Sequence, residues 1–110
     1  MNSNKSQRAY RVDRFVLPTS AREEFFAKAL HTQKFLRSLP GFLQDFVLEQ
    51  SSENGEFKVV TIVEWDSMES VEKAKPVVMA MHKEIDLNAQ EMFTRLGIKV
   101  EQGYYSHIDV

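Results

Sequence analysis

An indole beside a helix start is the first place where this chain could do chemistry. Trp65 ends the near-continuously apolar run at residues 59–65, and Asp66 then opens a helix. In an open α+β sheet, such a strand end is where a ligand crevice tends to lie. An indole there presents a large apolar ring and one N–H donor to such a crevice. The alternative, which the sequence leaves open, is a core anchor at the end of the strand.

A histidine on the following helix is the second candidate. His82 shares one helical face, by spacings of 3, 4 and 7, with Val71, Lys75, Val78 and Ile85. An imidazole in a pocket can act as a base near neutral pH. The alternative is a core or rim histidine hydrogen-bonded to the backbone. Together, Trp65 and His82 predict a pocket between a strand end and a helix face.

Asp13 is the third candidate. Strand alternation groups it with Phe15 and Leu17, on the side expected to face the pocket. Half-burial there would raise the pKa of the carboxyl, and Asp13 could then take a proton from a ligand. The alternative, which we favour, is an ion pair with Arg11 or Lys99.

Arg14, Tyr104 and Tyr105 offer a charge to hold an enolate or phenolate and a hydroxyl to donate. Their alternative role is contact across a dimer interface. His31 follows an apolar helical stripe by one position, so we expect it on the helix surface. His107 stands in the tail and supports no motif.

Composition excludes several classes of function. The chain has 110 residues, 43% of them hydrophobic, which suits one domain with its own core. Its net charge of −2 offers no basic surface for nucleic acid. No Cys is present and no two His stand four residues apart, so no metal site is expected. The four Gly form neither a phosphate loop nor a dinucleotide fingerprint, so no cofactor is expected.

The expected organisation is a short lead followed by one domain. Residues 1–7 are polar and lack an apolar signal segment, so we expect a disordered lead before a domain at residues 8–110. There is no apolar run of about 18 residues that could span a membrane. We therefore expect a soluble, cytoplasmic protein without a membrane partner.

The pattern of residues then predicts the elements. Residues 8–17 are extended in character, and Pro18 stops them. A capping box at residues 20–23 predicts a helix that begins near Ala21, and Pro and Gly at positions 40 and 41 end it.

Strands at residues 42–50 and 57–65 are predicted to form a hairpin around Asn54-Gly55. The next helix opens at Asp66, with Glu69 completing a capping box, and Pro76 inside it predicts a kink or a break.

A short helix follows from a capping box at residues 88–91 to a left-handed cap at Gly97, and residues 98–108 form the last strand. This order predicts a ferredoxin-like βαββαβ α+β fold with a short extra helix. Its four-stranded antiparallel sheet carries the helices on one face. The strand at 59–63 is apolar on both faces, so the uncovered face needs a partner. A second copy packed sheet on sheet is the simplest cover, which predicts a symmetric homodimer.

Four segments, in this order and spacing, carry a resemblance to a known family. They are residues 12–18, 35–42, 60–65 and 96–98. With them the chain resembles the antibiotic biosynthesis monooxygenase family of dimeric α+β barrels. The resemblance implies that fold, and it implies several activities: cofactor-independent oxygenation of anthrones or quinols, haem degradation, or smaller roles not tied to a reaction.

The resemblance also implies roles for single residues. Trp65 matches the pocket tryptophan of the anthrone oxygenases, but Thr61 stands where those enzymes have asparagine. His82 resembles the helix histidine that binds iron in the haem-degrading members. Those members also use an asparagine where this chain has Asp13, and a second tryptophan that this chain lacks.

The favoured hypothesis is a cofactor-independent monooxygenase that oxidises a small aromatic, of quinol or anthrone type, with molecular oxygen. Its catalytic residues would be Trp65, His82 and Asp13. Its substrate-binding residues would be Thr61, Val78, Arg14 and Tyr104. The alternatives are a non-catalytic small-molecule-binding or interaction domain and, third, a haem-degrading monooxygenase.

Overall fold

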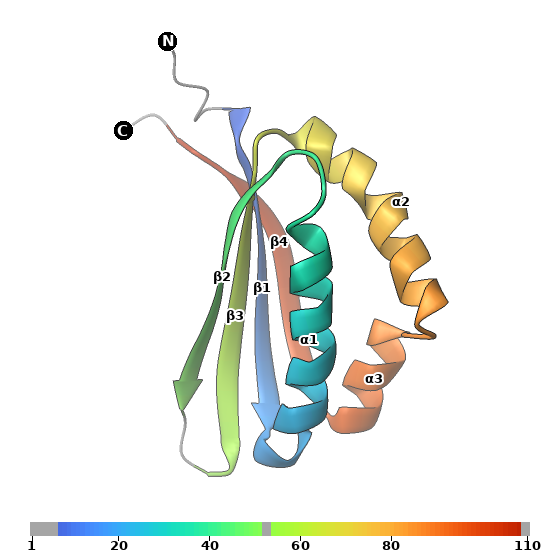
Figure 1. The fold of residues 1–110 in the computed structure, drawn as a ribbon. Helices are drawn as coiled ribbons and strands as arrows, with labels where there is room; N and C mark the ends of the chain where they lie inside the picture. Colours follow the sequence, from blue (N-terminus) through green and yellow to red (C-terminus); the bar gives the residue numbers. More distant parts are fainter. Residues whose placement is uncertain (1–6, 52–53, 109–110) are drawn as a thin grey trace.

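The computed structural model describes residues 7–51 and 54–108, so most of the expected lead at 1–7 lies outside the described residues. Its elements, in chain order, are β1 (Ala9–Pro18), the 3-10 turn η2 (Thr19–Ala21), α1 (Arg22–Leu36), β2 (Phe42–Ser51), β3 (Glu56–Trp65), α2 (Met68–Glu84), α3 (Ala89–Leu96) and β4 (Lys99–Ser106). The four strands form one antiparallel sheet in the order β2-β3-β1-β4, with the helices on one face (Figure 1). The predicted ferredoxin-like α+β fold is confirmed.

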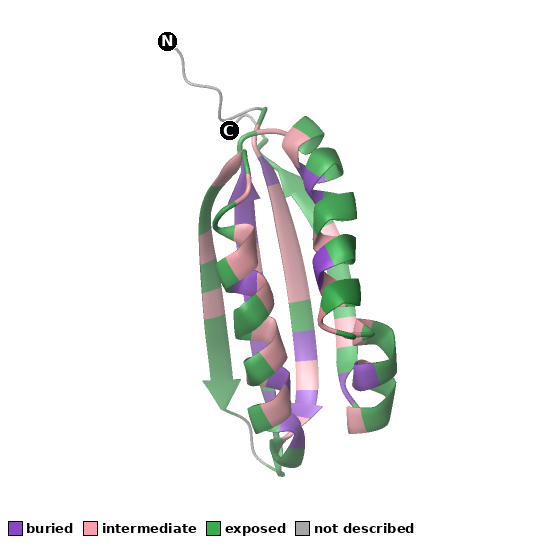
Figure 2. Ribbon diagram, turned by 45° about the vertical axis from the view of Figure 1, so that its right-hand side comes forward, coloured by how far each residue is buried: buried purple, intermediate pink, exposed green. Residues whose placement is uncertain are grey.

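Strand alternation separates the two faces of the sheet. In β3 the residues that face the helices are all buried: Phe57, Val59, Thr61, Val63 and Trp65. Residues directly opposite one another in an antiparallel pair share a face, so the register assigns the neighbouring strands as well. The outer surfaces of the helices are mostly exposed, and no residue of edge strand β2 is buried (Figure 2).

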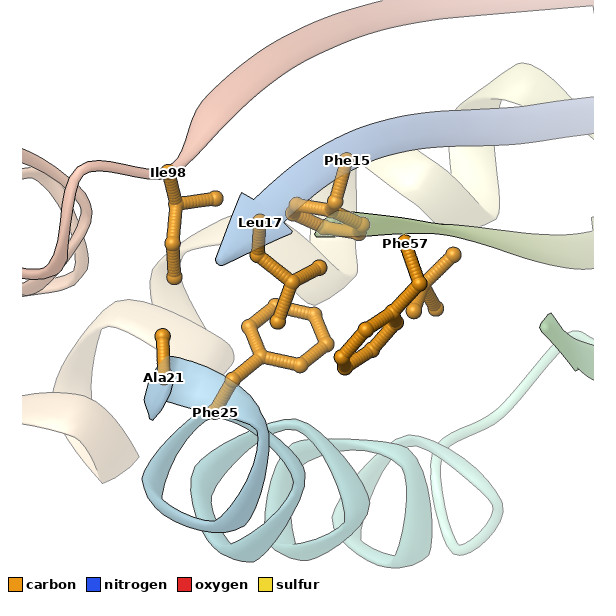
Figure 3. Close-up of a cluster of buried hydrophobic side chains, with 7 residues drawn as sticks. Phe15, Leu17, Ala21, Phe25, Phe57 and Ile98 are labelled. Atoms are coloured by element: carbon orange, nitrogen blue, oxygen red, sulfur yellow. The ribbon is translucent and has the colours of Figure 1, made fainter. Parts of the chain in front are cut away.

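Two apolar clusters hold the helices on the sheet, one near each end. At one end, Phe15, Leu17 and Phe57 point toward Phe25 of α1 (Figure 3). The Phe15 and Phe25 rings meet edge to face, with their centroids 4.8 Å apart. The second cluster brings Ala9, Val63 and Trp65 of the sheet against Val71 and Ala74 of α2. The sheet rows between the clusters carry polar side chains.

Two of the three predicted capping boxes are wrong. The chain enters α1 through η2, and Ala21, at the N-cap position, makes no side-chain hydrogen bond, so Ser20 does not cap α1. Ser67 rather than Asp66 caps α2, by accepting a hydrogen bond from the backbone N–H of Ser70. Asn88 caps α3 as predicted, and Gly97 ends it in the left-handed conformation.

Pro76 lies inside α2 without ending it. The helix continues as one element, so the alternative of a break is wrong. Proline has no N–H to donate to the carbonyl one turn back, so one helical hydrogen bond is lost. Val71 and Ala74 before the proline and Met81 after it are buried, so packing holds both halves of the helix against the protein.

No helix within the described ranges is long and apolar enough to cross a membrane.

A close contact between two turns fixes the end of β3, where Trp65 lies. The backbone N–H of Asp66 donates to the carbonyl of Gly41, at 2.8 Å. Gly41 has a φ of +88°, and a Cβ there would overlap the side chain of Ser70 and lie 2.9 Å from Oδ1 of Asp66. Glycine is therefore required at this position for both conformation and space.

Substitution of Gly41 by alanine should cost more stability than the same change at Gly55. Gly55 also has a positive φ, +75°, but nothing lies within 4 Å of its Cβ position. We expect Gly55→Ala to cost about 1 kcal/mol from the left-handed backbone alone. Gly41→Ala should cost about 3 kcal/mol, because overlap with Ser70 is added. Urea unfolding measures both, and equal losses would contradict the close contact of the two turns.

Candidate functional site

A cavity of about 440 Å³ lies between the sheet and the helices. Strands β1, β3 and β4 contribute to its wall, as do all three helices, and the wall is mostly apolar. Cavities of this size hold small organic ligands. Among the predicted site residues, the wall includes Asp13, Thr61, Trp65, Val78, His82 and Tyr104.

The register arranges the sheet side of the cavity in two rows. One row runs from Val63 through Arg11 to Tyr104, and the next from Thr61 through Asp13 to Gln102. All six side chains line the cavity. Polar groups in these rows therefore stand between the two apolar clusters, where a ligand in the cavity would meet them.

Trp65 lies at the end of β3 and is 4% exposed. Its ring meets Phe42 edge to face, with centroids 6.0 Å apart, and packs in the cluster with Val71 and Ala74. Its indole N–H donates to no group among the described residues. A buried tryptophan N–H usually has a partner, so Trp65 brings an unused donor to the cavity wall.

Thr61 adds a second polar group to the same strand face. It is 6% exposed and lines the cavity four residues before Trp65. Its hydroxyl has no hydrogen-bond partner in the part of the chain that the structure describes. A hydroxyl can both donate and accept, so Thr61 can bind an oxygen or a hydroxyl group of a ligand.

Asp13 faces the cavity and forms the ion pair that we favoured from the sequence. Nε of Arg11 donates to its Oδ1 at 2.5 Å. Burial raises the pKa of the Asp13 carboxyl, while the Arg11 charge and hydrogen bond oppose that rise. The terminal nitrogen of Arg11 donates in turn to the hydroxyl of Tyr104, at 2.8 Å. The three side chains form one connected group in the cavity wall.

His82 enters the cavity wall from the end of α2. Its Nε2 lies 3.0 Å from the hydroxyl oxygen of Thr32 in α1, so the other ring nitrogen is left without a partner among the described residues. Burial lowers the pKa of His82, and the charge of His31 lowers it further. A neutral imidazole with one free nitrogen can accept a proton near neutral pH.

Arg14 was wrongly placed in the pocket. It lies opposite Val60 and Glu101 on the uncovered face of the sheet, and it does not line the cavity. The same alternation that turns Asp13 toward the helices turns Arg14 away from them. Tyr105 likewise lies on the uncovered face, beside Tyr10.

Sequence reasoning missed six polar residues of the cavity wall: Arg11, Lys28, Thr32, Gln33, Lys75 and Gln102. Arg11 could have been found from its spacing to Asp13, and Lys75 from the helical face that it shares with His82. Thr32 and Gln102 carried no such signal. No group of three or more potential metal ligands occurs within residues 7–51 and 54–108.

Solved structures with the same fold include proteins described as oxygenases. No protein-family model matches the chain, and no match is found among the curated proteins. SnoaB, a cofactor-independent oxygenase from Streptomyces nogalater, matches with a TM-score of 0.62 and 18% identity, over 94% of this chain and 96% of SnoaB. A candidate antibiotic biosynthesis monooxygenase from Bacillus cereus matches with a TM-score of 0.59 and 14% identity, over 94% and 96% of the two chains.

A dimeric ferredoxin-like protein from an uncultured marine organism matches with a TM-score of 0.69 and 13% identity, over 94% of this chain and 98% of that protein. At these identities the likeness establishes the fold and not the reaction. These neighbours include a cofactor-independent oxygenase and a candidate antibiotic biosynthesis monooxygenase, so the fold implied by the sequence resemblance is confirmed.

His82 should titrate below the ordinary histidine pKa of 6.5, because its protonated form is partly desolvated and lies near His31. The pKa is lower in the folded than in the unfolded chain, so the stability that this group contributes is lost as the pH falls through the folded pKa. NMR titration of the imidazole resonances measures it, and His31→Gln should move the pKa of His82 upward. A pKa at or above 6.5 would contradict this description of the site.

Proposed function

We propose that this protein is a cofactor-independent monooxygenase of the antibiotic biosynthesis type. Its substrate is a small, electron-rich aromatic, such as a quinol or an anthrone, and its oxidant is molecular oxygen. The observation that carries the proposal is the unused indole N–H of Trp65, buried in the wall of a mainly apolar cavity that His82 also lines. An oxyanion donor and a base in one dry site are what this chemistry requires.

Each group then has a defined role. His82, neutral at pH 7, removes a proton from the phenol or from the acidic ring carbon. Trp65 stacks on the aromatic ring or donates its N–H to the oxygen on which negative charge develops. Asp13 is held as the partner of Arg11, so in this mechanism it orients that guanidinium and does not act as the base. Thr61 and Val78 contact the substrate.

The reaction needs no electron donor other than the substrate. The deprotonated aromatic passes one electron to O₂, which gives a substrate radical and superoxide. These two radicals then join through a new C–O bond and form a peroxide at the ring carbon. Loss of water then leaves a carbonyl. For an anthrone, the CH₂ group and O₂ give C=O and H₂O. For 1,4-naphthoquinol, the ring and O₂ give 2-hydroxy-1,4-naphthoquinone and H₂O, so atoms and electrons balance in both cases.

A non-catalytic binding domain is the alternative, and one observation favours it. Asp13, the carboxylate nearest the centre of the cavity wall by register, already has Arg11 as its partner. If His82 is equally engaged by Thr32 when a ligand is present, the cavity holds an aromatic molecule without activating it.

We also propose a homodimer that covers the free face of the sheet. On that face Phe46, Ile62 and Val12 lie side by side across three strands, and Leu48 and Val60 form the next row. Phe46 is 47% exposed and Leu48 is 51% exposed. A second copy packed sheet on sheet would remove these side chains from water. The dimeric state of a ferredoxin-like structural neighbour supports this arrangement.

Oxygen uptake by the purified protein with quinols and anthrones, without added cofactor, tests the activity. We expect turnover above the rate of spontaneous oxidation. Trp65→Phe should lower kcat/KM on the order of 10²-fold, because it keeps an aromatic ring but loses the N–H donor. His82→Gln should lower it by at least about 10²-fold, as expected when a general base is lost.

His107→Gln is the matched control, because His107 is exposed and lies beyond the end of β4, away from the cavity. Its rate should equal that of the unmodified protein. A haemin titration in parallel reports haem binding. Unchanged rates in Trp65→Phe and His82→Gln would disprove the mechanism, and no turnover with any substrate would favour the binding domain.

The dimer is tested by the double variant Phe46→Glu/Leu48→Glu, which puts charges on the free sheet face without touching the cavity. We expect it to elute as a monomer while the unmodified chain elutes as a dimer, with mass measured by multi-angle light scattering. Leu30→Glu is the control, because Leu30 is 43% exposed on α1. A monomeric unmodified chain, or a dimer that survives the double substitution, would contradict this interface.

A further inference from the structure

The cavity wall is positive, although the chain as a whole carries a net charge of −2. Among its residues are three cationic side chains, Arg11, Lys28 and Lys75, and one carboxylate, that of Asp13. His82 adds no positive charge near neutral pH, because burial lowers its pKa. Asp13 pairs with Arg11, and Glu72, the partner of Lys75, lies outside the wall, so an uncharged quinol or anthrone would leave the wall itself positive. The imbalance points to a negatively charged group on the ligand.

Arg11 has donors left for such a group. A guanidinium carries five N–H donors. Nε of Arg11 donates to Asp13 and one terminal nitrogen donates to Tyr104, and the described residues offer the remaining donors no other partner. The Arg11 side chain is 30% exposed, so water can hydrate its remaining N–H groups only in part. Arg11 can therefore bind a further oxygen at the cavity wall.

Lys75 stands beside the same tyrosine. Its Nζ lies 5.2 Å from the centroid of the Tyr104 ring, and Cζ of Arg11 lies 5.1 Å from that centroid. The partner of Lys75 is Glu72, one turn earlier on α2, whose side chain is 60% exposed. Such an exposed pair contributes little. Two cations near one ring repel each other, and an anion close to both would relieve that repulsion.

We propose that Arg11 and Lys75, both of which lie beside the ring of Tyr104, form an anion subsite, and that the ligand of the cavity is an aromatic carboxylate. The carboxylate lies at the Tyr104 end of the cavity, and the ring extends along Val63 toward Trp65. This inference rests on the proposed function for the aromatic part of the ligand, and it narrows the substrate to phenolic aromatic acids. A site built to bind a charged group discriminates strongly against analogues that lack it, because its own charges are then left unpaired.

Two probes that the proposed reaction does not oxidise show how much the negative charge of a ligand contributes to its affinity. Calorimetric titration with 2-naphthoate and with 2-naphthamide, which has the same shape but no charge, compares their affinities at pH 7. We expect the acid to bind about tenfold more tightly, as for hydrogen bonds to a charged group. Lys75→Met should remove most of that preference and leave the affinity for the amide unchanged.

Lys73→Met is the matched control, because Lys73 is an exposed lysine on the same helix and does not line the cavity. It should keep the full preference for the acid. Equal affinity for acid and amide, or a preference that survives Lys75→Met, would overturn the anion subsite and leave the proposed function standing. Failure of both probes to bind would overturn the subsite and the aromatic cavity together.

Discussion

The antiparallel pairing of β1 with β3 is the constraint on which both faces of this protein depend. It aligns Ala9 with Trp65, Arg11 with Val63 and Asp13 with Thr61, all on the side of the helices. A shift by one residue would exchange the two faces, bringing Arg14 into the cavity and turning Asp13 outward. Because apolar clusters close both ends of this pairing, the polar rows between them lie beside a cavity instead of packing against a helix.

Much of the fold and part of the site could be predicted, because both follow from local periodicity. Alternation along β1 placed Asp13 in the cavity, and helical spacing placed His82 there. The same alternation, applied to Arg14, would have excluded it and selected Arg11. Contacts between distant segments could not be predicted. The Thr32 hydroxyl meets His82 across 50 positions of sequence.

The start of α1 illustrates the same limit. The capping box was the best local signal, but the hydroxyl and the backbone N–H of Thr19 both bond to the carbonyl of Gly55, each at 2.8 Å. This contact with the distant β2–β3 hairpin accompanies a 3-10 turn ahead of the helix.

On the uncovered face, burial alone would raise the pKa of Glu64, but hydrogen bonds from Gln44, Tyr10 and Arg8 lower it instead. An ionised, fully bonded carboxylate therefore lies beside the apolar rows of the proposed dimer interface.

The central claim is that an aromatic ligand in the cavity engages the indole N–H of Trp65. The chain has one tryptophan, so its indole gives a single resonance in a ¹⁵N–¹H spectrum. Titration with 2-hydroxy-1,4-naphthoquinone, the product expected from 1,4-naphthoquinol, tests the claim without turnover. We expect a saturable downfield shift of this resonance, as a hydrogen bond forms to the ligand. Binding that leaves the indole resonance unmoved while other resonances shift would contradict the claim.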